Sequence, residues 1–563
     1  MKSLGPEKLA ELRQEAGARM AAGHAILADA LEKCSIKRVY GVSGTPVDRI
    51  FAECAARGIR PIATSNQQCA VLMAGAGNYV AGRLEAVVVV SAGPAVTNTL
   101  TGIHVARENG WPVIVLGGRR ALHKEGIGYF QELDAVPVLA PFTKMAATVR
   151  ETSEIIHIVF EAFVIAQAGR RGPVYVDLPE DVLEGYSAES RVSFPKLRSP
   201  PQIDLGAVQE AAMLLAEAKR PLLILGEDIR WSADAEPLRK LVEDFGIPFV
   251  TSPMGRGCLP DNHSLCVNVV RRWCQGQADV IVMAGAWFDW RFRFGTELAS
   301  DARVIHADAD ATTLGKNVAS SVSILGEPGE FLTRLATALG SEMRREREYR
   351  YSAWHEWLVQ ERAESCISSE RWLRRESQPL LPQQLYLALR DFLPENSIVA
   401  VEGNICLAAA QKVLQAHRPA SWLDPGRNGI IGASIAFAMG AKLAQPERPV
   451  FALCSDTGFG MSAMELEAAV RHRIPIIVVI ANNDGNGGAV RQKNFFPADY
   501  FERFSKFLPE LRYEQIMAMF GGHAEYITEV AQIRPALQRA VASGIPSCLN
   551  VRVDPHAPHS GFW

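Results

Sequence analysis

The stretch FALCSDTGFG (451–460), followed by MELEAAVRH (464–472) and IPIIVVIANNDGNGG (474–488), decides how the last part of this chain folds. Asp456 ends the first apolar run, and Asn483 ends the second, 27 positions later (483 − 456). This is the length of one strand–helix–strand crossover, so both side chains should emerge at the same edge of a parallel sheet. Oxygen ligands in glycine-rich loops at such an edge suit a Mg²⁺ ion that holds a diphosphate.

The loops around this pair supply further candidate ligands. The carbonyl of Gly485 can be a third oxygen ligand beside Asp456 and Asn483, and Mg²⁺ prefers such oxygen ligands. Thr457 and Gly458 open the helix after the first strand, where the backbone can approach a phosphate closely. A lone Asp would favour a polar strand end without a metal. An Asp combined with the glycine-rich run after Asn483 favours the ion.

Two other turns in the same region have two interpretations each. Glu402, Gly403 and Asn404 end the strand SIVAV and open a helix, which predicts either a second anion site or ordinary helix capping by Asn404. In GRNGIIG (426–432), Gly429 and Ile431 belong to a turn before a helix, and close packing of that helix against a sheet is the alternative to a ligand site.

Apolar strands alternate with helical periods through almost the whole chain, which predicts an α/β fold with three doubly wound, mainly parallel-sheet domains. The charge run SEMRREREYRYSAWHEW is expected to be a solvated connecting helix. The expected divisions are an N-terminal helical extension at 1–22, domains at 23–190, 203–339 and 379–563, and a charged helical linker at 340–378.

The composition excludes several classes of protein. The chain has 563 residues, too many for one core, and its 48% hydrophobic and 21% charged residues are typical of a globular enzyme. A formal net charge of −3 gives no basic field for nucleic acid or a membrane surface. The N-terminus lacks the apolar core of a signal peptide, and the ten cysteines form no CxxC pair. We therefore expect a cytoplasmic protein that acts on a small-molecule substrate and binds neither nucleic acid nor a membrane.

Together these motifs resemble thiamine diphosphate-dependent enzymes of the acetolactate synthase, benzaldehyde lyase and oxalyl-CoA decarboxylase type, over nearly the whole chain. In that family a motif that begins Gly-Asp-Gly and ends Asn-Asn binds Mg²⁺ and the cofactor diphosphate. Here Ser455-Asp456-Thr457 and Asn482-Asn483 occupy these positions. The resemblance implies thiamine diphosphate and Mg²⁺ as cofactors, and pyrimidine-binding, middle and diphosphate-binding domains in that order. It also implies a homodimer or homotetramer, because the cofactor lies between subunits.

The resemblance also assigns roles to single residues. Ile431 matches the bulky wedge that bends the cofactor into a V, and Gly429 matches the position whose carbonyl holds the pyrimidine amino group. Gln131, in GYFQELD, stands where a cofactor-facing glutamine is usual. The segments AGPAVTN (92–98) and GVSGTP (41–46) resemble two loops near the reacting carbon.

The chain departs from the family at the position that activates the cofactor. The usual His-Glu-Gln-Ala-Ala is here Asn66-Gln67-Gln68-Cys69-Ala70, so Gln67 replaces the glutamate that shares a proton with the pyrimidine. An amide can only donate or accept a hydrogen bond, and acid–base help is typically worth about 10²–10⁴-fold in rate. Three interpretations follow: activation of the cofactor is slower but sufficient, the protein binds the cofactor without chemistry, or another group takes the role. We favour the first of these.

The middle and last domains indicate the subfamily. GAWFDWRFRFG (285–295), HADADATTLGKNV (306–318) and YEQIMAMFGG (513–522) resemble 2-hydroxyacyl-CoA lyases and oxalyl-CoA decarboxylases. The expected function is therefore a thiamine diphosphate- and Mg²⁺-dependent C–C bond lyase or carboligase acting on 2-hydroxyacyl-CoA or a related CoA thioester. A 2-oxo-acid decarboxylating carboligase and a catalytically degenerate cofactor-binding homologue are the alternatives.

Two further expectations follow from the CoA interpretation. Arg271, Arg272 and Arg291 are candidates for binding a CoA phosphate. The tail HAPHSGFW (556–563) is expected either to close over the site, as tails do in the CoA-lyase relatives, or to be frayed.

Overall fold

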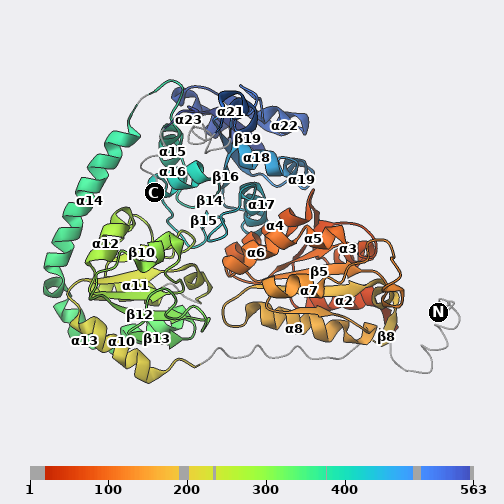
Figure 1. Cartoon of the computed structure of the whole chain (residues 1–563), viewed down its shortest axis with the longest axis horizontal. Helices are drawn as coiled ribbons and strands as arrows, with labels where there is room; N and C mark the ends of the chain where they lie inside the picture. Colours follow the sequence, from red (N-terminus) through yellow and green to blue (C-terminus); the bar gives the residue numbers. More distant parts are fainter. Residues whose placement is uncertain (1–19, 189–201, 233–235, 376, 486–495, 558–563) are drawn as a thin grey trace. The chain divides into compact units, whose positions relative to one another are not determined.

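The computed structural model of the protein contains three parallel sheets, each flanked by helices (Figure 1). This confirms the predicted α/β class with three doubly wound domains. The chain divides into two compact units: residues 1–107 and 111–198 form the first, and residues 108–110 and 199–563 form the second. The structure describes residues 20–188, 202–232, 236–375, 377–485 and 496–557.

The first unit contains a six-stranded parallel sheet with the order β3-β2-β4-β5-β7-β6. Strand side chains alternate between the two faces, so Val87 and Val89 join α2 (Gly23–Lys33) and α8 (Ile155–Gln167) in one core cluster. Helix α4 (Gln67–Ala81) packs against β2, β4 and β5. The strands are β2 (Arg38–Val42), β3 (Arg60–Ala63), β4 (Ala86–Val90), β5 (Val113–Arg119), β6 (Ala146–Thr148) and β7 (Pro173–Pro179).

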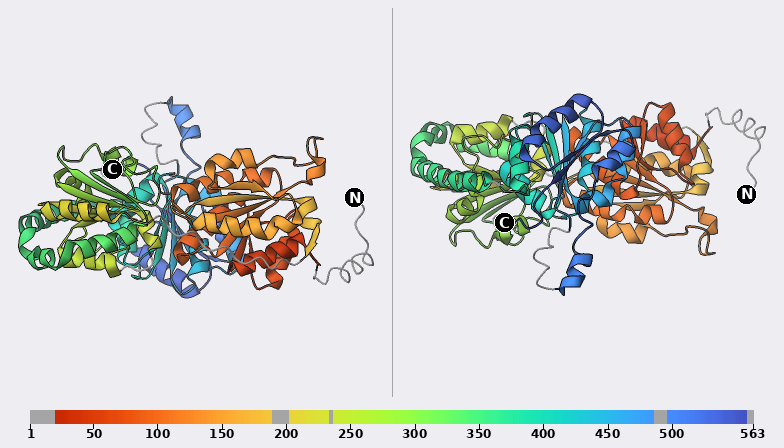
Figure 2. Two further views of the ribbon diagram at one scale, coloured as in Figure 1. Left: turned by 90° about the horizontal axis from the view of Figure 1, so that it is seen from below. Right: turned by 90° about the horizontal axis from the view of Figure 1, so that it is seen from above.

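The second unit contains two sheets. The five-stranded middle sheet has the order β10-β9-β11-β12-β13, and the six-stranded last sheet has the order β15-β14-β16-β17-β19-β18. The two further views in Figure 2 show helices beside the strands of each sheet. The middle strands are β9 (Pro221–Leu225), β10 (Phe249–Thr251), β11 (Val280–Ala284), β12 (Arg303–Asp308) and β13 (Val322–Leu325). The last are β14 (Ile398–Val401), β15 (Trp422–Leu423), β16 (Val450–Ser455), β17 (Ile477–Asn482), β18 (His523–Ile527) and β19 (Ser547–Arg552).

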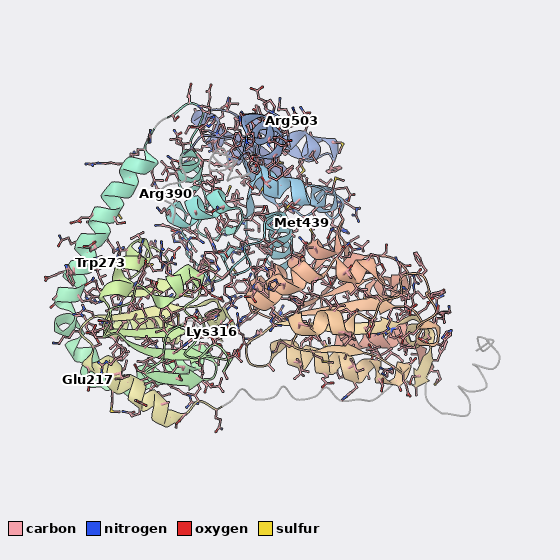
Figure 3. All side chains as sticks on the ribbon, in the orientation of Figure 1. Glu217, Trp273, Lys316, Arg390, Met439 and Arg503 are labelled. Atoms are coloured by element: carbon pink, nitrogen blue, oxygen red, sulfur yellow. The ribbon has the colours of Figure 1, made fainter. Side chains whose placement is uncertain are left out.

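The crossover predicted from the spacing of Asp456 and Asn483 is present. Strands β16 and β17 are parallel neighbours, and Ser455 lies opposite Ala481. Two short helices, α18 (Asp456–Ser462) and α19 (Glu465–Arg471), connect them. Helix α17 (Ser434–Ala444) packs on β14 and β16, and its fully buried Met439 is labelled in Figure 3. Both predicted ligand positions therefore lie at the carboxyl edge of the sheet.

The sequence-based prediction missed five strands at the edges of the parallel sheets, β3, β6, β13, β15 and β18, and the paired strands β1 and β8, but it did include the edge strand β10. An edge strand is covered on fewer sides than a central strand, so it lacks the continuous apolar run by which the central strands are recognised. Strand β13, for example, alternates buried and exposed residues, whereas every residue of β4 and β9 is buried.

The structure differs from the predicted divisions of the chain at the N-terminal extension and at the charged linker. Residues 1–19 of the expected N-terminal helix lie outside the described part of the chain. Met20–Ala22 form strand β1, because they pair antiparallel with β8 (Tyr186–Ala188). The charged linker is helical, with α13 (Pro328–Arg350) and α14 (Ser352–Leu373), but α14 is not simply solvated. Its Trp354 is 2% exposed and stacks on Trp273, which Figure 3 labels.

None of the helices in the described ranges combines the length and the apolar character that a membrane crossing requires.

Candidate active site

The last sheet reverses its strand order between β14 and β16, since β15 lies on one side of this pair and β17 on the other. Crevices outside the carboxyl ends of strands at such a reversal are the usual ligand sites of open α/β sheets. A cavity of about 120 Å³ lies there. Its lining includes Gly403, Asn404, Ile431, Ser455, Thr457 and Asn483 from the sequence analysis, together with Pro382, Ile405, Cys406, Ala481, Val553, Asp554, Pro555 and Ala557.

Asp456, Asn483 and Gly485 converge beside this cavity. One terminal atom of the Asn483 amide lies 3.2 Å from Asp456 Oδ2 and 3.0 Å from the carbonyl oxygen of Gly485. With nitrogen at that position the amide donates to both oxygens. With oxygen at that position, the oxygens of Asn483, Asp456 and Gly485 lie close together, and a cation between them would relieve their repulsion. The three residue types thus fit the oxygen-ligand set expected for Mg²⁺.

The charge of the cavity supports the same conclusion. Its described lining residues include no Lys or Arg, while Asp554 lines it and Asp456 lies beside it. A diphosphate carries several negative charges and would meet no positive side chain from these residues. A bound cation is therefore the group that could neutralise it at this position.

Asp456 is held by the first turn of α18. It is 1% exposed, and burial raises its pKa to about 6, against hydrogen bonds from Gly485 N and Thr457 N that lower it. Thr457 N donates to Asp456 Oδ1 at 2.7 Å, and Gly458 N donates to Ser455 Oγ at 3.1 Å. The sequence analysis assigned these two N–H groups to a phosphate. In the structure they donate instead to the side chains of Asp456 and Ser455 in the same turn.

Asn404 does not cap a helix. It is the first residue of α16 (Asn404–Val413), and the N-cap is Gly403, with φ of 83°. A Cβ on Gly403 would lie 3.2 Å from Ser455 Oγ, so this position suits glycine in both conformation and space. The exposed Asn404 side chain is left at the cavity, which favours a ligand role over capping.

Glu402 is a buried carboxyl group that the sequence analysis named only as the first residue of the turn before Asn404, without a role of its own. It is fully buried, and its Oε2 accepts hydrogen bonds from the backbone N–H of Ala433 and Ser434. Its Oε1 has no hydrogen-bond partner among the residues that the structure describes. Burial raises its pKa to about 7. A Cβ on Gly458 would lie 2.0 Å from Oε1. Glu402 therefore connects the turn before α17 with the start of α18, and its place directly after a strand was the one available signal.

The turn that Glu402 holds carries the predicted wedge. Ile431 is half-buried and lines the cavity. Gly429 and Gly432 on either side have φ of 70° and 81°, a conformation that residues with a Cβ rarely adopt. Gly429 is exposed and has open space at its Cβ position, so the structure places it in the turn but not in the cavity lining.

In the first unit, Gln67 is the first residue of α4, directly after the helix cap. Asn66 is the N-cap, and its side chain accepts a hydrogen bond from Gln68 N at 2.8 Å. Asn98 Nδ2 donates to Gln67 Oε1 at 3.1 Å. Asn66 is thus a good helix cap, and Gln67 is oriented by the loop after β4.

Gln131 lies against the same loop. A Cβ on Gly93 would be 2.9 Å from Gln131 Cβ, and Gln131 itself has φ of 60°. The GVSGTP loop (41–46) also reaches this edge, since a Cβ on Gly44 would lie 3.1 Å from Ser91 Cβ. The loops that carry Gln67, Gly93, Gln131 and Gly44 therefore meet at the carboxyl edge of the first sheet.

Two of the three candidate arginines for CoA are engaged in ion pairs within the chain. Arg291 is 7% exposed and forms ion pairs with Asp289 at 2.7 Å and Glu227 at 3.0 Å. Arg272 pairs with Glu297 at 2.6 Å. The guanidinium of Arg271 lies 5.4 Å from the centre of the Phe292 ring.

For the predicted closing tail, Ala557 lines the cavity of the last sheet, and residues 558–563 lie outside the described part of the chain.

Three family models match successive parts of the chain. Residues 20–138 match the N-terminal TPP binding domain of thiamine pyrophosphate enzymes, residues 208–335 their central domain, and residues 403–551 their C-terminal TPP binding domain. The first and third matches contain the loops of Gln67 and of Asp456, respectively.

Three named relatives match almost the whole chain. A probable acetolactate synthase of Mycobacterium bovis is 31% identical over 94% of this chain and 95% of its own length. The 2-hydroxyacyl-CoA lyase 1 of Mus musculus is 31% identical over 95% of this chain and 94% of its own. The oxalyl-CoA decarboxylase of Escherichia coli K12 is 30% identical over 96% of both chains.

Proposed function

The chain belongs to the thiamine pyrophosphate enzyme family, and we propose that within it this protein is a Mg²⁺-dependent carbon–carbon bond lyase or carboligase. The convergence of Asp456, Asn483 and Gly485 beside a cavity whose described lining has no basic residue carries this proposal. The three residues would hold Mg²⁺, and Gly403, Asn404, Thr457 and Gly458 would surround the diphosphate.

When bound, thiamine diphosphate supplies the carbanion chemistry, and the protein orients it and excludes water. Ile431 would support the bent cofactor from the second unit, and Gly429 would accept a hydrogen bond from the pyrimidine amino group through its carbonyl. In the first unit Gln67 and Gln131 would face the cofactor. Since Asn98 occupies Gln67 Oε1, Gln67 can offer its Nε2 as a hydrogen-bond donor but cannot take up a proton.

Two classes of substrate are candidates. The first is a 2-hydroxyacyl-CoA thioester, cleaved to a carbonyl compound and formyl-CoA, and the similarity to 2-hydroxyacyl-CoA lyases supports it. The second is a 2-oxo acid, decarboxylated and joined to an acceptor. The ion pairs of Arg291 and Arg272, which leave these side chains engaged within the chain, favour the second class.

We also propose a homodimer or homotetramer. The family resemblance places the cofactor between the first domain of one subunit and the last domain of another. Ile127 and Phe130, near Gln131, are 71% and 69% exposed, and Met461 and Met464, near Gly458, are 62% and 56% exposed. Apolar side chains exposed to this degree around both half-sites are suited to a subunit interface. Light scattering at several protein concentrations tests this.

The decisive experiment is turnover with thiamine diphosphate, Mg²⁺ and a panel of 2-oxo acids and 2-hydroxyacyl-CoA thioesters, with products identified by mass. Formyl-CoA selects the lyase, and CO₂ with an acyloin selects the carboligase. The Asp456→Ala variant is the control for contaminating activity. Cofactor binding without any product in the panel would instead support the degenerate homologue.

A further inference from the structure

Two consecutive arginines, Arg119 and Arg120, lie at the end of β5, and the charges around them differ. Arg119 forms ion pairs with Glu125 at 2.7 Å, with Asp134 at 3.2 Å and with Asp177 at 2.6 Å. Glu125 and Asp134 lie at the two ends of the loop that carries Gln131. Arg119 is therefore a structural residue whose charge is compensated within the chain.

Arg120 is more deeply buried than Arg119, and its hydrogen-bond partners among the described residues are uncharged. It is 8% exposed, its Nε donates to Phe130 O at 3.0 Å, and its Nη2 donates to Gln131 Oε1 at 2.9 Å. Its guanidinium lies 5.3 Å from the centre of the Phe130 ring. Within the described ranges no carboxylate lies at ion-pair distance from it, and Nη1 makes no hydrogen bond there.

A buried charge without a counter-charge is unfavourable, so such groups are normally paired or bind an ion or ligand. Arginine presents a planar set of donors that matches a carboxylate, and with Nε and one Nη2 hydrogen engaged, the Nη1 donors remain for a second partner. The surroundings of Arg120 therefore suit a bound anion, which would compensate its charge and accept hydrogen bonds from Nη1.

The position of Arg120 connects it with the activating end of the site. Arg120 binds Gln131, Gln131 packs against Gly93, and Asn98 at the end of the same loop binds Gln67. These residues form a continuous series of contacts at the carboxyl edge of one sheet. An anion held by Arg120 would lie beside the two glutamines assigned to the cofactor.

We propose that Arg120 binds the carboxylate of the acceptor substrate, which is then a 2-oxo acid or another carbonyl compound bearing a carboxylate. This inference rests on the proposed carboligase function. A cation bound to the carboxylate that leaves as CO₂ would stabilise the ground state and oppose its loss. The acceptor retains its carboxylate, so a strong charge-assisted contact to it only favours binding and orientation.

The test compares acceptors that differ by one charge. With a 2-oxo acid donor, kcat and KM are measured for glyoxylate and for the uncharged acetaldehyde as acceptors. A charge-assisted hydrogen bond corresponds to about a 10- to 100-fold effect, so Arg120→Gln should raise the KM for glyoxylate by that factor and leave that for acetaldehyde nearly unchanged. Arg120→Lys should restore part of the affinity, because it keeps the charge.

Arg448 offers a matched control. It is also partly buried and donates to neutral oxygens, those of Asn396, Ser397 and Ser421, but it lies in the second unit. Arg448→Gln reports the general effect of losing such an arginine, so it should not change the ratio between the two acceptors. An equal loss for both acceptors in Arg120→Gln would overturn the proposal and leave Arg120 as a positioning residue for Gln131.

A binding measurement separates failure of this inference from failure of the proposed function. Lactate and lactamide have nearly the same shape, but only lactate carries a carboxylate. NMR titration of the cofactor-loaded protein should show lactate binding that is lost in Arg120→Gln, even if no turnover is found. Equal lactate binding by the wild-type and Arg120→Gln proteins would contradict the role of Arg120, whatever the activity.

Discussion

Asn98 donates a hydrogen bond of 3.1 Å from its Nδ2 to Oε1 of Gln67. The proposed function gives Gln67 the position of an activating glutamate, and this contact determines which end of its amide is available. Its Oε1 is occupied, and its Nε2 remains as a donor. The residue at the activating position can therefore orient a ring nitrogen by a hydrogen bond, but it cannot accept a proton from it.

The first prediction concerns this position. Gln67→Glu should speed hydrogen–deuterium exchange at the thiazolium carbon of bound thiamine diphosphate by about 10²–10⁴-fold, because a carboxyl group can share a proton with the pyrimidine. Exchange is followed by NMR after rapid quenching. We also expect the variant to lose selectivity in carboligation. If exchange remains at the wild-type rate, residue 67 does not have the activating role.

The second prediction concerns the metal. Asp456→Asn should lower Mg²⁺-dependent binding of thiamine diphosphate about tenfold or more, since it removes the charged ligand of the proposed site. The apo variant should be no less stable than the wild type, because burial disfavours the Asp456 charge that it removes. Calorimetric titration with Mg²⁺ and after chelation, together with thermal melts, measures both effects. Tight cofactor binding by chelated wild-type protein would argue against a Mg²⁺ site.

The third prediction uses two glycines of the same helix. Gly458→Ala should destabilise the protein by about 1–3 kcal/mol, because the new Cβ would lie 2.0 Å from Glu402 Oε1. Gly460→Ala is the matched control, since no atom of the described residues lies within 4 Å of its Cβ position and alanine favours a helix. Urea denaturation of the two variants measures the difference. Equal stabilities would show that Glu402 moves away without cost.

The fourth prediction is a pH dependence. The pKa of Glu402 is raised by burial from 4.5 to about 7, so the folded state favours the protonated carboxyl group. Its contribution to stability is fully present below about pH 4.5 and is lost as the pH rises through about 7. At 1.36 kcal/mol per pKa unit, the full effect is on the order of 3 kcal/mol.

Glu402→Gln tests this, because it keeps the shape and removes the titration. The free energy of unfolding of the wild type relative to this variant should fall between pH 4.5 and 7, as measured by urea denaturation at a series of pH values. A constant difference across that range would mean that Glu402 titrates normally in the folded protein.

Much of the fold followed from local patterns. Central strands were predictable because each is a buried apolar run, and β16 and β17 could be paired because one crossover separates Asp456 from Asn483. Edge strands such as β3 and β18 were missed, since one side of an edge strand is unpaired and its sequence carries a weaker signal. The burial of Trp354 in the charged helix α14 was also missed, because a single aromatic face within a charge run resembles a solvated helix.

Part of the candidate site likewise followed from the sequence, and part required the tertiary structure. The sequence by itself supplied the candidate oxygen ligands, Asp456 and Asn483, and the amide of Gln67 at the proposed activating position, because these depend on residue type and on spacing within one motif. Only the tertiary structure decided that, within the described part of the chain, Arg119 is paired with three carboxylates and its neighbour Arg120 with none, and that Glu402 lies against Gly458. These relationships join residues from separate strands and loops, and the energy of a charge depends on which distant groups the fold brings beside it.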